Sequence, residues 1–139
     1  MKKQLKILIL LFVISLTANL QDAYAQCICR QWNFINNTGC DIDLIAETPP
    51  PCAVTGALGT VFAFSPLSVR PPCFATDCGL ICPWAVRVVG SNFALGAGAP
   101  SGTVYHNVVP CASCPSGWMM ATYTVLPSGD YQLIFDCQP

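Results

Sequence analysis

Charged side chains are scarce in this sequence of 139 residues: Asp, Glu, Lys and Arg make up 9 % of it, whereas an ordinary soluble domain has roughly 25 %. The lysines all lie at the very start of the chain, at Lys2, Lys3 and Lys6. The remaining cations are widely separated, at Arg30, Arg70 and Arg87. A basic footprint for nucleic acid and a cationic face for a membrane surface are therefore not expected.

Groups that catalyse reactions are also few. The single histidine, His106, falls in an apolar run that predicts a strand, where a sheet residue is a simpler interpretation than a catalyst. The glycines of residues 96–98 are followed by Pro100 and not by the start of a helix, so they do not form a phosphate loop. Asp41 and Asp43 share one face of an expected strand, as the paired carboxylates of a glycosidase do, but a solvated strand face explains them more simply. We therefore expect no enzyme, no catalytic residues, no cofactor and no metal site.

No hydrophobic run is long enough to span a bilayer. The longest covers residues 7–16, whereas a spanning helix needs roughly 20 apolar residues. Lysines precede this run, and a polar stretch ending in Ala23-Tyr24-Ala25 follows it, which is the order of a secretory signal peptide. The leader resembles those of secreted proteins of Gram-negative bacteria whose mature chain opens with Gln. We expect a signal peptide at residues 1–25, one domain at residues 26–139, and secretion through the periplasm to the extracellular space.

Cysteine, by contrast, is abundant, and all ten cysteines follow the expected cleavage point. An even number in a small exported chain is typical of a disulfide framework. Cys78, Cys82, Cys111 and Cys114 also have spacings that a structural zinc could use, and the last two could form a redox pair, but oxidation outside the cell competes with metal capture. We expect disulfides, with the pairing left open, at Cys27, Cys29, Cys40, Cys52, Cys73, Cys78, Cys82, Cys111, Cys114 and Cys137.

Helix signals are nearly missing, and strand signals recur along the chain. Alternation with period two or β-branched and aromatic composition predicts strands over residues 30–35, 40–46, 58–64, 84–89, 103–109, 118–126 and 131–137. Residues 91–102 predict a loop or a weak edge strand. We therefore expect an all-β fold, a single antiparallel β-sandwich of about seven or eight short strands stapled by disulfides.

Several finer features follow from this pattern. Asn36-Asn37-Thr38-Gly39 separates the first two predicted strands and predicts that they form a hairpin. Residues 58–64 are more continuously apolar, which suits burial on both faces, and residues 65–82 predict a long stapled loop. If the strands at residues 84–89 and 103–109 run antiparallel, one pole of the sandwich would gather Cys73, Cys78, Cys82, Cys111, Cys114 and Cys137.

The N-terminal cysteines, Cys27 and Cys29, point to the same side of an extended segment because they are two residues apart. The simpler interpretation is that both bridge within the chain and hold an N-terminal strand that would otherwise fray. The other is an arm that adds a strand to the sheet edge of a neighbouring subunit, as in donor-strand complementation.

The low charge and heavy cross-linking predict a structural, self-assembling or adhesive subunit of an extracellular surface or fibre, because a surface poor in charge is tolerable when neighbouring subunits bury it. Its partners would be further copies of the chain, in an oligomer or polymer. A compact stapled monomer with a polar surface of Ser, Thr, Asn and Gln is an equally simple interpretation. The alternative function is a small secreted module that binds carbohydrate or another ligand, with a polysaccharide as partner. Its aromatic platforms would come from Trp32, Trp84, Tyr105, Trp118, Tyr123 and Tyr131, of which Trp118 is expected nearest a loop.

Overall fold

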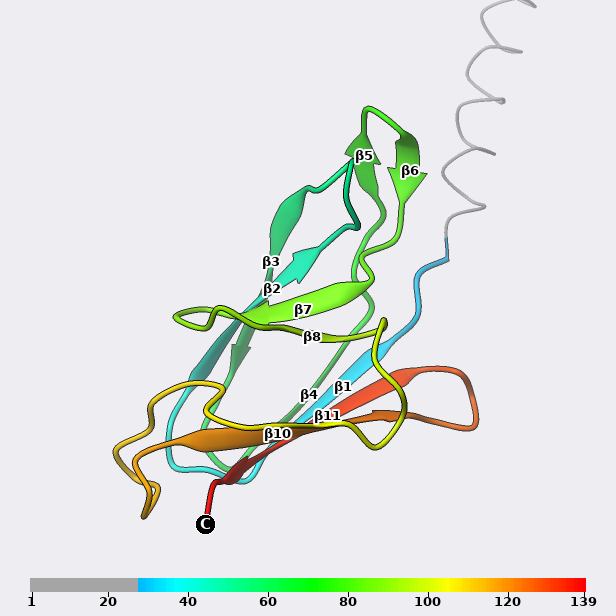
Figure 1. Ribbon diagram of the computed structural model, residues 1–139. Coiled ribbons are helices and arrows are strands. Elements are labelled where there is room, and N and C mark those ends of the chain that lie inside the picture. Colours follow the sequence, from blue (N-terminus) through cyan, green and yellow to red (C-terminus); the bar gives the residue numbers. More distant parts are fainter. Residues whose placement is uncertain (1–27) are drawn as a thin grey trace, which may run out of the picture.

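The computed structural model describes residues 28–139 and shows an all-β chain, with no helix in that range (Figure 1). The expected signal peptide and Cys27 lie outside the described residues. The strands of the described part are β1 (Trp32–Asn36), β2 (Ile42–Glu47), β3 (Thr55–Val61), β4 (Pro66–Val69), β5 (Phe74–Thr76), β6 (Gly79–Ile81), β7 (Ala85–Val88), β8 (Ala94–Gly96), β9 (Val104–Tyr105), β10 (Met119–Val125) and β11 (Tyr131–Cys137).

Two larger sheets carry most of these strands. One has the order β4-β1-β11-β10-β9 and the other the order β3-β2-β7-β8. Neighbouring strands run antiparallel, except that β1 and β11 run parallel, from Trp32 beside Tyr131 to Asn36 beside Phe135. The short strands β5 and β6 form a separate ribbon, at the top of Figure 1.

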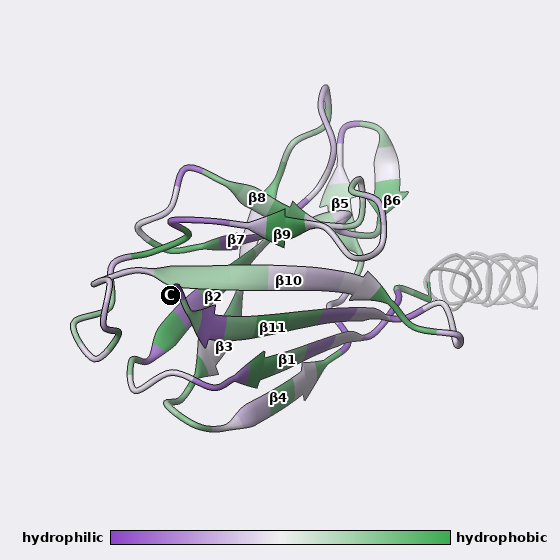
Figure 2. Cartoon of the chain, turned by 60° about the horizontal axis from the view of Figure 1, so that its bottom comes forward, coloured by the Kyte–Doolittle hydropathy of each residue, from purple (hydrophilic) through white to green (hydrophobic). Residues whose placement is uncertain are grey.

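A single cluster of buried apolar side chains draws on both larger sheets. Side chains that alternate in burial along the strands supply it. Figure 2 shows a hydrophobic stretch in both β1 and β11, with hydrophilic residues beside it. The two sheets come especially close where Gly96 lies over the ring of Trp32, because a Cβ atom on this glycine would overlap the indole. Gly96 also has a φ of 122°, which side chains rarely adopt, so both packing and backbone require glycine here.

The predicted hairpin of residues 30–35 and 40–46 is wrong. β1 pairs with β4 and β11, whereas β2 pairs with β3 and β7, so the turn between them carries the chain from one sheet to the other. The buried amide of Asn36 explains this crossover. Its Nδ2 donates to the carbonyl oxygens of Cys40 at 2.8 Å, Phe62 at 3.1 Å and Val61 at 3.3 Å, and its Oδ1 accepts from the backbone N–H and the hydroxyl of Thr38.

The all-β class, the antiparallel pairing and the disulfide stapling are confirmed, but a single sandwich of seven or eight strands is not. Residues 65–82, predicted as a loop, contain β4, β5 and β6. The strand predicted over residues 103–109 is reduced to the two residues of β9. The strand predicted over residues 58–64 begins earlier, as β3, and is a half-exposed edge strand and not a strand buried on both faces.

Tyr123 gives the fold a pH dependence that can be measured. Its side chain is fully buried, its hydroxyl has no hydrogen-bond partner among residues 28–139, and burial together with Tyr131 and Tyr105 raises the pKa of Tyr123 to about 12. The unfolded chain loses this proton near pH 10, so the contribution to stability is complete below pH 10 and falls as the pH rises toward 12, by up to about 1.4 kcal/mol per pH unit.

We expect Tyr123→Phe to stabilise the protein by about 1 kcal/mol at pH 7, because the variant no longer buries an unsatisfied hydroxyl. The variant should also lose less stability between pH 9 and pH 11.5 than the original protein does. Urea denaturation at several pH values measures both effects. An alkaline loss of stability that is equally steep in the two proteins would contradict the assignment to Tyr123.

Candidate functional site

Disulfides fix the ends of the strands. All cysteines of residues 28–139 are oxidised, including Cys73. Pairs in the described part of the chain are Cys29–Cys82, Cys40–Cys111, Cys52–Cys78 and Cys114–Cys137. Such a framework is consistent with an extracellular protein.

The alternative zinc site and the redox pair are both contradicted. Cys78, Cys82, Cys111 and Cys114 each belong to a different disulfide, so the structure does not bring the four together. Cys111 and Cys114 staple a loop to two other segments and do not bond to each other.

The expected single pole of six cysteines is also wrong. Cys29–Cys82 lies just before β1, whereas Cys40–Cys111 lies just beyond its other end. Cys137 ends β11, which runs parallel to β1, so its disulfide with Cys114 lies at that second end as well. The reason is that β7 and β9 belong to different sheets, and their flanking cysteines do not converge.

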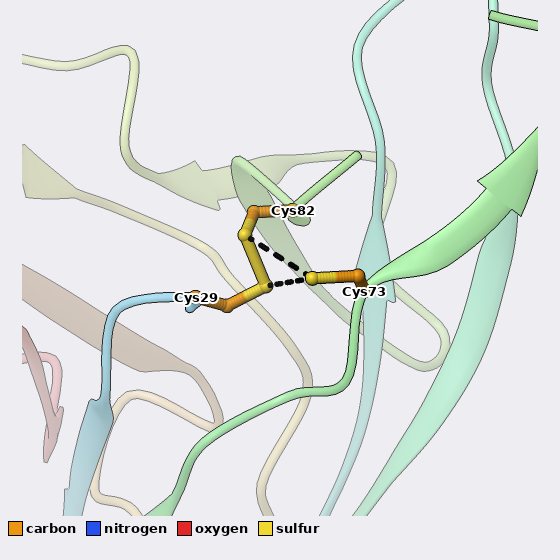
Figure 3. A group of neighbouring side chains, drawn as sticks. All are labelled: Cys29, Cys73 and Cys82. Carbon is orange, nitrogen blue, oxygen red and sulfur yellow. Dashed lines mark hydrogen bonds between the residues drawn. A yellow bond between two sulfur atoms is a disulfide. The ribbon is translucent and has the colours of Figure 1, made fainter. Parts of the chain in front are cut away.

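Three sulfur atoms meet at the first end, where Cys29, Cys73 and Cys82 lie together (Figure 3). The Sγ of Cys73 is 3.3 Å from that of Cys29 and 3.7 Å from that of Cys82. Their spacing would suit a metal ion, but a metal binds the thiolate, and these sulfurs are held in disulfides. The cluster is therefore a cross-link that fastens the start of β1 to the segments flanking β5 and β6.

Two phenylalanines stand out on the surface at the opposite end. Phe62 is 63 % exposed and Phe64 is 74 % exposed, on the corner between β3 and β4. We call these two side chains the aromatic tip. Phe64 has a φ of 54°, which is a genuine outlier for a bulky residue. Such strained conformations persist only where the surroundings hold them, and they are concentrated at functional sites.

The backbone of the aromatic tip is held from several sides. The N–H of Ala63 donates to Oδ1 of Asp41 at 2.8 Å, and the N–H of Phe64 donates to the carbonyl of Thr38 at 3.1 Å. The amide of Asn36 holds the carbonyl of Phe62. The two phenyl rings are therefore displayed on a rigid support.

Asp41 and Asp43 act separately and do not form a pair of catalytic carboxylates. Asp41 holds the aromatic tip, and Asp43 accepts a hydrogen bond of 2.6 Å from the hydroxyl of Thr60 on β3. The apolar run of residues 58–64 concealed the tip, because it predicted one buried strand that includes Phe62 and Phe64. Their exposure depends on the β3–β4 corner, which no local pattern indicated.

A shallow groove of about 300 Å³ lies where β7 and β8 meet β9. We call it the Trp84 groove; its lining consists of Trp84, Ala85, Ala94, Gly96, Gly98, Ala99 and Tyr105. Trp84 is 43 % exposed, and its ring lies so close to Gly98 that a Cβ there would be 3.0 Å from it. No charged side chain is present in this lining, and its polar side-chain groups are the Tyr105 hydroxyl and the indole N–H of Trp84.

Trp118 has more polar surroundings. It is 39 % exposed and lies beside a loop, as predicted. The hydroxyl of Ser116 donates to the carbonyl of Gln138 at 2.7 Å, and the side-chain oxygen of Gln138 accepts from the N–H of Asn107 at 2.9 Å. His106 is exposed next to Asn107, in a bend beyond β9 and not in a strand as predicted.

The other candidate platforms are structural. Trp32 and Tyr123 are buried, and Tyr131 packs on Trp32 with ring centroids 4.6 Å apart. Trp84 and Trp118 are thus the exposed tryptophans of the described chain, with Tyr105 half-buried beside the former.

No family model, curated protein or solved structure matches the chain. In residues 28–139 there is no helix with the length and apolar character needed to cross a membrane.

We expect the purified protein, unfolded in denaturant without reduction, to have no cysteine that reacts with a thiol reagent and no stoichiometric zinc. Peptide mapping without reduction should recover the four disulfides found in the structure. Reactive thiols at Cys78, Cys82, Cys111 and Cys114, together with bound zinc, would overturn the disulfide assignment.

Proposed function

We propose that this protein is an exported structural or adhesive subunit that works by self-association at an extracellular surface or in a fibre, without catalytic turnover. We take the two larger sheets as the layers of one β-sandwich, because one buried cluster draws on both. The sandwich then serves as a durable frame on which contact residues are displayed.

The aromatic tip is the observation that carries this proposal. Two large apolar side chains on this strained, hydrogen-bonded corner are exposed to water, which is unfavourable, and they are not part of the buried core. Each phenylalanine that is buried against a partner contributes about 1.5–3 kcal/mol. Phenylalanine is enriched at protein interfaces relative to the rest of the surface.

Contact through side chains is better supported than the addition of strands to a sheet edge. The edge strand β3 has a register shift opposite Leu44 and Ile45, and Gly59 there has a φ of 125°. Such bulges protect edges from pairing, as does the proline in β4, and the edge strands β8 and β9 are very short. Cys29 bridges within the chain, which favours an N-terminal strand held in place over a donor arm.

The double variant Phe62→Ser with Phe64→Asn tests the proposal. Asn tolerates positive φ, so the backbone of the corner should be preserved. We expect the original protein to associate at high concentration in light scattering or sedimentation, and the variant to associate at least about tenfold more weakly, because the free energy of two buried rings is lost.

Val125→Ser is the matched control. Val125 is also exposed, but it lies beside the start of β11, at the end of its sheet that is away from the aromatic tip. This variant should associate as the original protein does. An original protein that stays monomeric at every concentration, and does not adhere to itself on a surface, would refute the proposed function.

A carbohydrate-binding module is the second candidate, and the surroundings of Trp118 favour it. An exposed indole provides an apolar face for stacking, and Ser116 and Gln138 supply polar groups in the adjoining segments. If this function is the correct one, the monomeric protein should bind polysaccharide in a pull-down assay, and Trp118→Ala should reduce binding at least about tenfold. Trp84→Ala should leave polysaccharide binding unchanged, and loss of binding in both variants would contradict the Trp118 site.

A further inference from the structure

We propose that the aromatic tip of one copy docks into the Trp84 groove of the next copy, so that the chain associates head to tail. This inference rests on the proposed function and names the contact through which it would act. The partner is therefore a second copy of this chain.

The two surfaces lie at opposite ends of β2. Asp41, which holds the aromatic tip, directly precedes the strand, whereas the N–H of Trp84 donates to the carbonyl of Glu47 at 3.0 Å, where the strand ends. A strand of this length spans about 17–20 Å. A chain therefore cannot place its tip in its own groove, and the contact has to be made between copies.

The groove has a suitable size and chemistry for a phenyl ring. Its volume of about 300 Å³ is larger than the roughly 150 Å³ of an apolar cavity that holds benzene. No charged residue lines the groove, and the Asp41 carboxylate beside the aromatic tip accepts the N–H of Ala63. A ring of the tip would thus lie against Trp84 and the small residues, while Arg87, opposite Ala94, is paired with Glu47.

A sugar is a poorer occupant of this groove. Its hydroxyl groups need hydrogen-bond partners, and Tyr105 is the only residue of the lining with a side-chain hydroxyl. A lining of alanine, glycine and indole favours an apolar guest. The Trp84 groove differs in this respect from the polar surroundings of Trp118.

Docking through unlike surfaces leaves a free tip and a free groove at the ends of every assembly. Such heterologous contacts extend into open chains unless the rotation closes a ring. Two phenylalanines bury at most about 150–250 Å² each, so a single contact is smaller than the roughly 1,200 Å² of a stable complex. We therefore expect association that grows with protein concentration and is reversed by dilution.

The groove is tested with Ala94→Glu, which places a charge in its lining at an exposed position of the edge strand β8. The matched control is Ala57→Glu, because Ala57 is also exposed, on the other edge strand of the same sheet, and lies outside the groove. We expect Ala94→Glu to lower association at least tenfold and Ala57→Glu to leave it unchanged. Loss of association in Ala57→Glu alone would instead assign the contact to the β3 edge and overturn the inference. Equal thermal unfolding of the variants confirms that the fold is retained.

Mixing two defective variants gives the most specific result. The Phe62→Ser/Phe64→Asn variant retains its groove and the Ala94→Glu variant retains its tip, so neither should associate alone, but their mixture should form a one-to-one dimer in sedimentation. If Ala94→Glu associates by itself while the tip variant does not, the groove inference fails and the proposed function stands. If the original protein never associates, the proposed function itself fails.

Discussion

The buried amide of Asn36 determines how the two larger sheets are joined. It lies at the end of β1 and holds the carbonyls of the β3–β4 corner with its nitrogen, while its oxygen holds the turn at Thr38. Without this side chain the buried N–H of Thr38 would lose its partner, at a cost of about 1–3 kcal/mol. The same side chain thus stabilises both the crossover between the sheets and the corner that displays Phe62 and Phe64.

Disulfides reinforce the same frame where the core alone is small. A domain of this size buries a smaller fraction of its surface than a larger one does, and cross-links compensate by restricting the unfolded chain. The four disulfides found close segments separated by 23 to 71 residues, and each is worth roughly 3–4 kcal/mol in the chain-entropy model. Cys40–Cys111 lies directly beside the crossover, so the support of the aromatic tip is both hydrogen-bonded and covalently held.

The local sequence pattern predicted the strands that bury one face, but it failed where contacts between distant segments determine the structure. Residues 131–137 alternate between the two faces of a predicted strand and form β11 with those bounds, because the side chains of a half-buried strand point in turn toward the core and toward solvent. The turn at Asn36 has the residues of a hairpin turn, and nothing local distinguishes a hairpin from a crossover. Phe62 and Phe64 likewise continue a strand pattern, and only the corner turns them outward. The pairing of the cysteines depends on which sheet each neighbouring strand joins, and the local sequence pattern does not determine this.

A charge-poor protein that displays apolar residues has to avoid indiscriminate aggregation. Its sheet edges are interrupted by a bulge in β3 and a proline in β4, and β8 and β9 are too short to template a long strand. The exposed rings of Phe62 and Phe64 lie on a hydrogen-bonded corner, and that of Trp84 lies in the groove. A rigid support lowers the conformational entropy lost on contact, so that a small apolar area can stabilise association in one defined orientation. Interrupted edges and a rigid tip together favour directed association over uncontrolled strand pairing.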